Sequence, residues 1–185
     1  MSIDDNYYKA HITPSDINEH LPMLLYYAKK CEHITEMGVR GVVSTWAFLK
    51  ANPKKLVCYD LEKSDNIDTA LHLANDAGIE MKFHEADVLE VDIEQTDLLF
   101  IDTFHTGTQL RKELELHAKK VNKYIAFHDT FTFWEDGEPT YGDASYTLDK
   151  GNGLKHAILD FLLKNKEWSI VYGTSANNGL LIISK

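Results

Sequence analysis

The chain has 185 residues, 44% of them hydrophobic, which is enough to build one domain around a single buried core. The formal net charge of −10 argues against nucleic acid as a partner, because binding a phosphate backbone needs clustered Lys and Arg on one face. The sequence opens without a basic and apolar leader, and no apolar run approaches about 20 residues, so we expect neither export nor a membrane partner.

The two cysteines, Cys31 and Cys58, fall at a predicted helix end and inside a predicted strand, which is no disulfide framework. A reducing cytoplasm is therefore the expected location. A homo-oligomer is compatible with this composition, but no pattern in the sequence sets the oligomeric state.

The first predicted element is a helix from Ser15, a suitable N-cap, to about Lys30. Its apolar residues repeat on one face: Leu21, Leu24, Leu25 and Ala28. We expect residues 1–32 to form a helical lid or packing layer that precedes the first strand.

The segment 36–44, EMGVRGVVS, follows a β-like run over 33–35 and leads into a helix. Gly38 and Gly41 allow a tight turn and a close approach to a ligand, and the start of the helix offers free N–H groups. Glu36 repels a pyrophosphate but pairs well with a cationic amino group. The loop therefore suits the methionine half of S-adenosylmethionine better than a dinucleotide.

Strands and helices alternate after this loop. Strands are predicted at 55–60, 79–83, 97–102 and 124–129, and helices at 46–51, 67–77, 109–121 and 154–164. Residues 130–153 are polar, acidic and aromatic, as expected for an active-site loop. The last two strands, 168–172 and 180–184, are joined by a short turn-rich segment and must be antiparallel.

This alternation predicts an α/β fold, a Rossmann-like, doubly wound, mostly parallel seven-stranded sheet with a C-terminal antiparallel hairpin strand. Ligands of such sheets bind at the carboxyl ends of the strands. An acidic residue follows each of five predicted strands: Glu36, Asp60, Asp87, Asp102 and Asp129. We therefore expect the binding site at this edge.

Six crossover-linked strands closed by an antiparallel hairpin strand, with an acid after each of the first two, resemble the class I S-adenosylmethionine-dependent methyltransferases. The segments 36–44, 100–106 (FIDTFHT), 124–130 (YIAFHDT) and 168–180 are similar to a small bacterial and phage O-methyltransferase-like group. That group is related to cephalosporin-hydroxylase and to macrolide and sugar O-methyltransferases. The resemblance extends from about residue 33 to the end of the chain.

The resemblance implies that four residues hold the methionine end of the donor: Glu36, Gly38, Gly41 and Ser44. Asp60 would accept the ribose hydroxyls, since a carboxylate can accept from both oxygens of a vicinal diol, and Asp87 would accept from the adenine amine. A divalent metal, magnesium or manganese, would have three ligands: Asp102, His128 and Asp129.

The chain departs from its relatives in the segment Ile101-Asp102-x-x-His105, where Phe104 replaces a second acid, so a carboxylate base is missing. His105 becomes the expected catalytic base, because an imidazole pKa near 6.5 suits proton removal near neutral pH. Asp102 is the other expected catalytic residue, near the sulfonium and the acceptor. His128 in place of an acid suits manganese, iron or zinc as well as magnesium.

Plainer interpretations stay open for these residues. Asp60 and Asp87 can be turn residues, His105 can cap a helix, and His128 with Asp129 can be a strand-end pair without a metal. Three aromatic residues of the long loop are either core residues or part of an acceptor-facing lid: Trp134, Tyr141 and Tyr146.

The expected function is S-adenosylmethionine-dependent O-methylation of a small polar acceptor, such as a sugar or glycan hydroxyl. Phe104 motivates one alternative, a non-catalytic module that binds the donor. The other alternative, a nicotinamide-dependent oxidoreductase, fits the sheet. It fits the loop poorly, because its Gly-x-Gly-x-x-Gly fingerprint reads here as Glu36-x-Gly38-x-x-Gly41.

Overall fold

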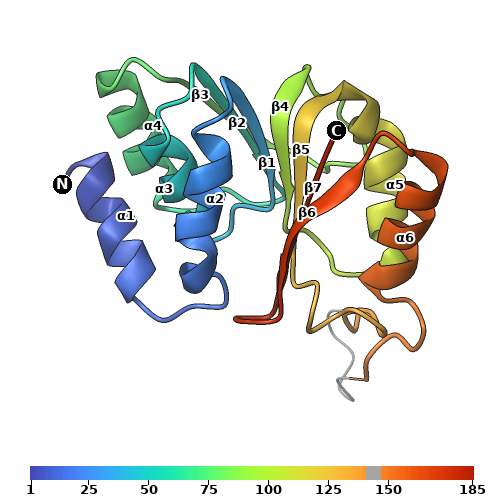
Figure 1. The fold of residues 1–185 in the computed structure, drawn as a ribbon. Helices are drawn as coiled ribbons and strands as arrows, with labels where there is room; N and C mark the ends of the chain where they lie inside the picture. The colour runs from blue at the N-terminus through green and yellow to red at the C-terminus, as the bar shows by residue number, and fades with distance from the viewer. Residues whose placement is uncertain (141–146) are drawn as a thin grey trace.

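The computed structural model describes residues 1–140 and 147–185, and these form one sheet with helices on both faces (Figure 1). The strands are β1 (His33–Met37), β2 (Lys55–Asp60), β3 (Glu80–Glu85), β4 (Thr96–Ile101), β5 (Val121–His128), β6 (Ser169–Thr174) and β7 (Leu180–Ser184). Their order in the sheet is β3-β2-β1-β4-β5-β7-β6. The neighbours from β3 to β5 pair in parallel, and β7 runs antiparallel to both β5 and β6. The predicted seven-stranded Rossmann-like sheet is confirmed.

The helices of the described ranges form two layers. They are α1 (Ile3–Ile12), α2 (Leu21–Ala28), α3 (Val43–Lys50), α4 (Ile67–Asp76), α5 (Gly107–His117) and α6 (Leu154–Lys164). The first four cover one face of the sheet, and α5 and α6 cover the other (Figure 1). A buried apolar cluster lies under each layer, as a sheet covered on both faces requires.

The N-terminal layer differs from its prediction. The expected helix from Ser15 to Lys30 is a 3-10 turn at Asn18–His20 followed by α2. Pro22 explains the break, because inside a longer helix it would lack an N–H and clash with the preceding turn, whereas it is tolerated in the first turn of α2. Helix α1, which the prediction missed, begins with a capping box in which Ser2 and Asp5 bind each other's backbone N–H.

Strand β1 is longer than predicted, and this affects the site. It continues through Glu36 to Met37, so the acid lies in the strand and not in the loop. Side chains alternate between the faces of a strand, and Glu36 therefore shares its face with Ile34, under α2 and α3. Strand β5 also begins earlier than predicted, at Val121, because α5 ends at His117 and only a 3-10 turn follows.

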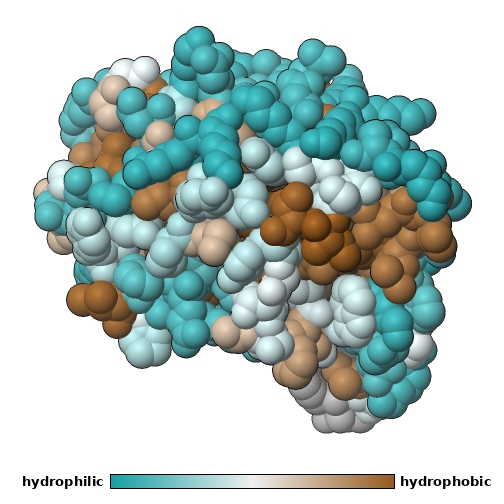
Figure 2. Space-filling view, in the orientation of Figure 1, coloured by the Kyte–Doolittle hydropathy of each residue, from teal (hydrophilic) through white to brown (hydrophobic). Residues whose placement is uncertain are grey.

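The outer strand β6 carries exposed apolar side chains, including Ile170 (52% exposed) and Val171 (45%). Leu159 and Leu163 of α6 are exposed as well. Figure 2 shows a hydrophobic area over β6 and α6. The opposite edge strand, β3, has charged residues instead, with Lys82 bonded to Glu80. No helix of the described ranges is both long and apolar enough to cross a membrane.

Candidate active site

The turn after β1 brings the backbone of the loop against the end of β4. Gly38 has a φ of +85°, and a Cβ there would lie 1.9 Å from the backbone oxygen of Asp102. Only glycine fits such a position. Gly41 is different, because a Cβ there would meet only a methyl group of Val43 at 3.7 Å. The loop takes positive φ at Arg40 and Val42 instead, so the prediction that both glycines shape the turn holds for Gly38 alone.

Asp60, at the end of β2, holds this loop. Its Oδ2 atom accepts hydrogen bonds from the backbone N–H of Val39 (2.7 Å) and of Arg40 (2.8 Å). Its Oδ1 atom accepts a longer bond, 3.3 Å, from the N–H of Glu62. The carboxylate therefore fixes the loop whether or not it also binds a ribose.

A cavity of about 320 Å³ opens at the carboxyl ends of β1, β2 and β4, a volume that suits a small-molecule ligand. Its walls include four residues that the sequence predicted for the site: Gly38, Asp60, Asp87 and Asp102. The other wall residues were not predicted to bind a ligand, and they include Arg40, Tyr59, Phe104 and Gln109. Phe104 and Tyr59 are the aromatic residues of this wall, and the Tyr59 ring stacks on His84.

Glu36 and Ser44, which the resemblance implies hold the methionine end of the donor, are not in the wall of this cavity. The Glu36 side chain is fully buried and accepts hydrogen bonds from Ser44 Oγ (2.5 Å), Thr45 Oγ1 (2.8 Å) and Cys58 Sγ (3.2 Å). Burial raises the pKa of Glu36 to about 7, although these bonds act in the opposite direction. The physical reason is the register of β1, which turns Glu36 toward α3. The Glu36 carboxylate thus binds the first turn of α3 through Ser44 and Thr45.

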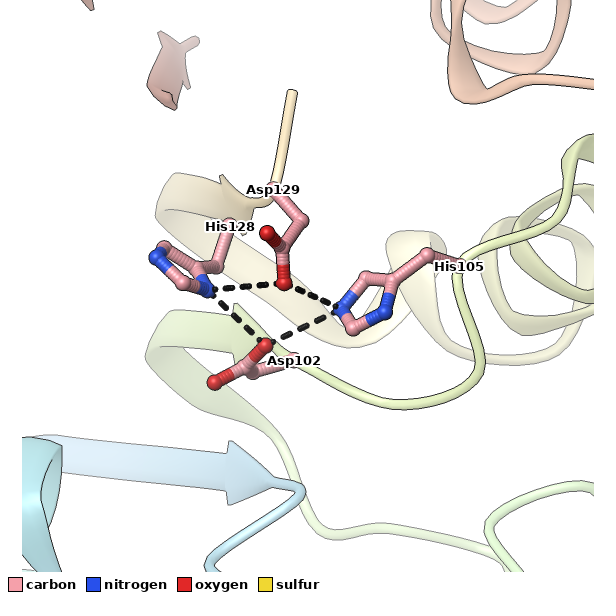
Figure 3. A group of neighbouring side chains, drawn as sticks. All are labelled: Asp102, His105, His128 and Asp129. Atoms are coloured by element: carbon pink, nitrogen blue, oxygen red, sulfur yellow. Dashed lines mark hydrogen bonds and ion pairs between the residues drawn. The ribbon is translucent and has the colours of Figure 1, made fainter. Parts of the chain in front are cut away.

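Four side chains converge beside the cavity, at the ends of β4 and β5 (Figure 3). His105 Nε2 lies 3.1 Å from Asp102 Oδ1 and 3.0 Å from Asp129 Oδ2. His128 Nδ1 lies 3.0 Å and 3.3 Å from the same two oxygen atoms. One donor atom from each residue thus falls in a group whose members all lie within 4.8 Å of one another.

Each imidazole of this cluster has a second partner on its outer side. His105 Nδ1 lies 2.9 Å from Glu138 Oε2, and His128 Nε2 donates to the backbone oxygen of Asp16 at 3.1 Å. The ring of His105 also stacks on Phe133, with centroids 5.2 Å apart. Metal-binding histidines characteristically have such a carboxylate or carbonyl behind them, which fixes the orientation of the ring.

The charges of the cluster hold both imidazoles in the protonated form when no metal is bound. Burial alone would lower the pKa of His105, but hydrogen bonds with Asp102 and Glu138 raise it to about 9. Burial opposes the shift at His128 too, where the charge and hydrogen bond of Asp102 raise the pKa to about 10. The pKa of Asp102 falls well below its usual range, because the two imidazolium charges outweigh its burial.

These values apply to the metal-free cluster, and there the pKa of His105, the catalytic base that the sequence predicts, lies above the 6.5 of a free imidazole. An imidazole with a pKa of about 9 is already protonated at neutral pH and cannot accept a proton. Both of its ring nitrogens also face carboxylates. The geometry favours His105 as a fourth metal ligand.

The donor set fits a divalent transition metal. Two imidazole nitrogens and two carboxylate oxygens suit manganese, iron or zinc, whereas magnesium prefers oxygen ligands alone. The charge also balances. A divalent cation would replace the two imidazolium protons that, without metal, neutralise the carboxylates of Asp102 and Asp129. Of the two metals that the resemblance implies, manganese fits these ligands better.

Some site residues could not be found from local sequence patterns. Glu138 and Asp16 reach the cluster from the loop after β5 and from the segment after α1, neither of which carries a ligand motif. Trp134 is half-buried and packs against the core under α5 and α6. The other two aromatic residues of the predicted lid, Tyr141 and Tyr146, lie outside the described residues.

Solved structures share this fold at low sequence identity. A protein assigned as a caffeoyl-CoA O-methyltransferase from Staphylococcus aureus is 15% identical, with a TM-score of 0.64 over 100% of this chain and 92% of that chain. Cofactor-bound Rv0187 from MTB is also 15% identical, with a TM-score of 0.64 over 98% and 87% of the two chains. The SAH-bound methyltransferase PaMTH1 of Podospora anserina is 16% identical, with a TM-score of 0.58 over 98% and 86%.

The sequence itself matches no protein-family model and no curated protein. At these identities the structural likeness shows the fold. The chain has the Rossmann-like methyltransferase fold, with the strand order and the antiparallel β7 described above.

Proposed function

We propose that this chain is an S-adenosylmethionine-dependent methyltransferase that uses a divalent metal ion to methylate an oxygen atom of a small polar acceptor. One observation carries the proposal. Asp102 belongs both to the wall of the 320 Å³ cavity and to the cluster of metal-ligating side chains. A donor in the cavity and an acceptor at the cluster would therefore meet at Asp102.

The fold supports the donor assignment, because structures that share it include methyltransferases with bound S-adenosylhomocysteine. Asp60 and Asp87 line the cavity, and the resemblance implies that they accept from the ribose hydroxyls and the adenine amine. Gly38 lets the loop approach the ligand closely. Phe104 also lines the cavity and is available to contact the base.

Asp102, His105, His128 and Asp129 would hold the metal ion. A divalent cation at this place lowers the pKa of a hydroxyl group that binds to it. The protein then has to align the acceptor oxygen with the sulfonium for an in-line displacement, and this positioning supplies most of the rate. Glu138 and the Asp16 carbonyl keep the two imidazoles in place.

The acceptor is assigned by chemical class only. We propose a sugar or glycan hydroxyl, on the resemblance to sugar and macrolide O-methyltransferases. Glu138, in the loop after β5, contacts His105 of the cluster, so this loop adjoins the proposed acceptor site. A non-catalytic donor-binding module is the second candidate, because Phe104 occupies the position of an acid in the relatives.

The first experiment is calorimetry of the full chain with S-adenosylmethionine, S-adenosylhomocysteine and NAD, after EDTA treatment and again with added manganese or magnesium. We expect tight binding of the first two ligands, with loss of affinity in Asp60→Ala. Preference for NAD, or no binding of any adenosyl ligand, would end the methyltransferase proposal. Binding without methyl transfer to any of a panel of hydroxylated acceptors, even with manganese, would favour the non-catalytic module.

A further inference from the structure

Asp16 connects the segment between α1 and α2 to the candidate active site through two contacts. Its backbone oxygen accepts the hydrogen bond from His128 Nε2 at 3.1 Å. Its Oδ2 atom forms an ion pair with Arg40 of the loop after β1. The other carboxylate oxygen, Oδ1, is buried and has no hydrogen-bond partner among the described residues.

The Oδ1 atom requires a donor. A carboxylate oxygen that is shielded from water and accepts no hydrogen bond costs free energy, and such atoms are rare in native proteins. Asp16 itself is not in the cavity wall, but its ion-pair partner Arg40 is. If Arg40 turns aside, a ligand at that part of the wall can approach the Asp16 carboxylate. A cationic group on that ligand would satisfy Oδ1.

Arg40 is able to turn. Its side chain is 78% exposed, and the Asp16 carboxylate is its recorded ion-pair partner. It lines the cavity, as do Gly38 and Asp102, and its charge interacts with Asp102 and Asp129 of the metal-ligating cluster. The donor's amino-acid group belongs near these residues, because its sulfonium has to lie near Asp102 for transfer.

We propose that Asp16 and Arg40 together recognise the zwitterionic α-amino-acid end of the donor. Asp16 Oδ1 accepts from the α-ammonium, and the Arg40 guanidinium donates to the α-carboxylate. This inference rests on the proposed function, and it gives Asp16 the task that the sequence assigned to Glu36. The oxygens of Glu36 are already used by Ser44, Thr45 and Cys58, as described above.

The charges of this arrangement are complementary in both states. Before binding, the anion and the cation of the protein neutralise each other. After binding, each faces the opposite charge of the zwitterion, so no charge is left without a partner. A ligand that lacks the amino-acid group cannot pair with both side chains. Asp16 and Arg40 therefore select for ligands that carry this group.

The test compares two ligands that share the adenosine and the thioether. S-Adenosylhomocysteine has the amino-acid group, and 5′-methylthioadenosine lacks it. In Asp16→Asn we expect calorimetry to show about 10- to 100-fold weaker binding of S-adenosylhomocysteine, the range for loss of a hydrogen bond between charged groups. Binding of 5′-methylthioadenosine should stay within about twofold of the unmodified chain, which also shows that the variant is folded.

Arg40→Gln should also weaken binding of S-adenosylhomocysteine and spare 5′-methylthioadenosine, because it removes the proposed hydrogen bond to the α-carboxylate of the ligand. Glu19→Gln is the matched control. Glu19 lies three residues after Asp16 and is exposed, so the variant removes the same charge and should change the affinity for neither ligand. If Asp16→Asn is unfolded and binds neither ligand, the result for Arg40→Gln decides. Equal weakening of both ligands, or unchanged affinity for S-adenosylhomocysteine, would overturn the inference and leave the donor site intact. If the unmodified chain binds neither ligand, the proposed function fails instead.

Discussion

The Nδ1 atom of His128 lies 3.0 Å from Asp102 Oδ1, while Nε2 of the same ring donates to the backbone oxygen of Asp16. A carbonyl can only accept a hydrogen bond, so the Nε2 atom carries a proton. The Nδ1 atom then faces two carboxylates with either a second proton or a metal ion. Protons and metal therefore compete for the same place in the cluster.

This competition predicts that metal binding releases protons. The pKa values of about 9 for His105 and about 10 for His128 mean that both rings are protonated at pH 7 without metal, and both must lose a proton to become ligands. We expect about two protons released per manganese ion, and an affinity that rises up to about 100-fold per pH unit between pH 6 and pH 8. Calorimetry in buffers of different ionisation enthalpy measures the number of protons released per manganese ion. Release of fewer than about half a proton would show that the imidazoles are not ligands.

The same pKa values predict how the stability of the metal-free protein depends on pH. A histidine whose pKa is raised on folding stabilises the protein fully below its unfolded pKa of about 6.5. That stabilisation is lost as pH rises through about 9 for His105 and about 10 for His128. We therefore expect the Tm in EDTA to fall between pH 7 and pH 10, and to fall less with saturating manganese. A Tm that is flat over this range in EDTA would contradict the protonated cluster.

Glu138 is expected to control metal affinity without touching the metal. Its carboxylate lies 2.9 Å from His105 Nδ1 and orients the ring. Glu138→Gln should weaken manganese binding about 10- to 100-fold, the usual effect of removing such a partner. Glu135→Gln is the control in the same loop, because Glu135 is exposed and pairs with Lys155 on the surface. Manganese titration of both variants measures the difference, and equal affinities would exclude this role.

Glu36 is expected to matter for stability and not for direct contact with the donor. Glu36→Gln should leave the affinity for S-adenosylhomocysteine within about threefold. Glu36 is not in the cavity wall, and its oxygens accept from Ser44, Thr45 and Cys58. Asp60→Ala, in the cavity wall, should weaken it about tenfold or more. A large loss of affinity in Glu36→Gln would mean that the carboxylate reaches the donor after all.

The raised pKa of Glu36 gives this variant a second, independent measurement. An acid whose pKa rises from 4.5 to about 7 on folding destabilises the protein as pH increases through that interval. The unmodified chain should therefore lose Tm between about pH 5 and pH 8 through this group. Glu36→Gln should remove that part of the decline.

Much of the fold could be predicted because its signals are local. Buried strands of uniform apolar character, each ending at an acid, give a parallel sheet, and the topology then brings Asp102 and Asp129 to one edge. His128 and His105 join them because each is close in sequence to a strand end. The N-terminal helix was mispredicted because the apolar periodicity was given more weight than Pro22.

The direction of Glu36 was available in the sequence and was missed. Ile34 precedes it by two positions, and two residues in such a relation share one face of a strand. Asp16 and Glu138 carry no comparable signal. Asp16 contacts a residue 112 positions away and Glu138 one 33 positions away, and only the assembled fold sets those distances.

Two glycines of the same loop should respond very differently to alanine. At Gly38 the added Cβ meets the backbone oxygen of Asp102 at 1.9 Å, and the φ of +85° is unfavourable for any side chain. Because backbone cannot move aside cheaply, we expect Gly38→Ala to lower the free energy of unfolding by about 2 kcal/mol or more. It should also weaken binding of S-adenosylhomocysteine, since the shifted loop carries Arg40 and closes the cavity.

Gly41→Ala has room for its methyl group and should change stability by less than about 0.5 kcal/mol. Urea unfolding of the two variants measures both effects, and a Gly38→Ala protein as stable as Gly41→Ala would show that the loop does not pack against the end of β4 as described.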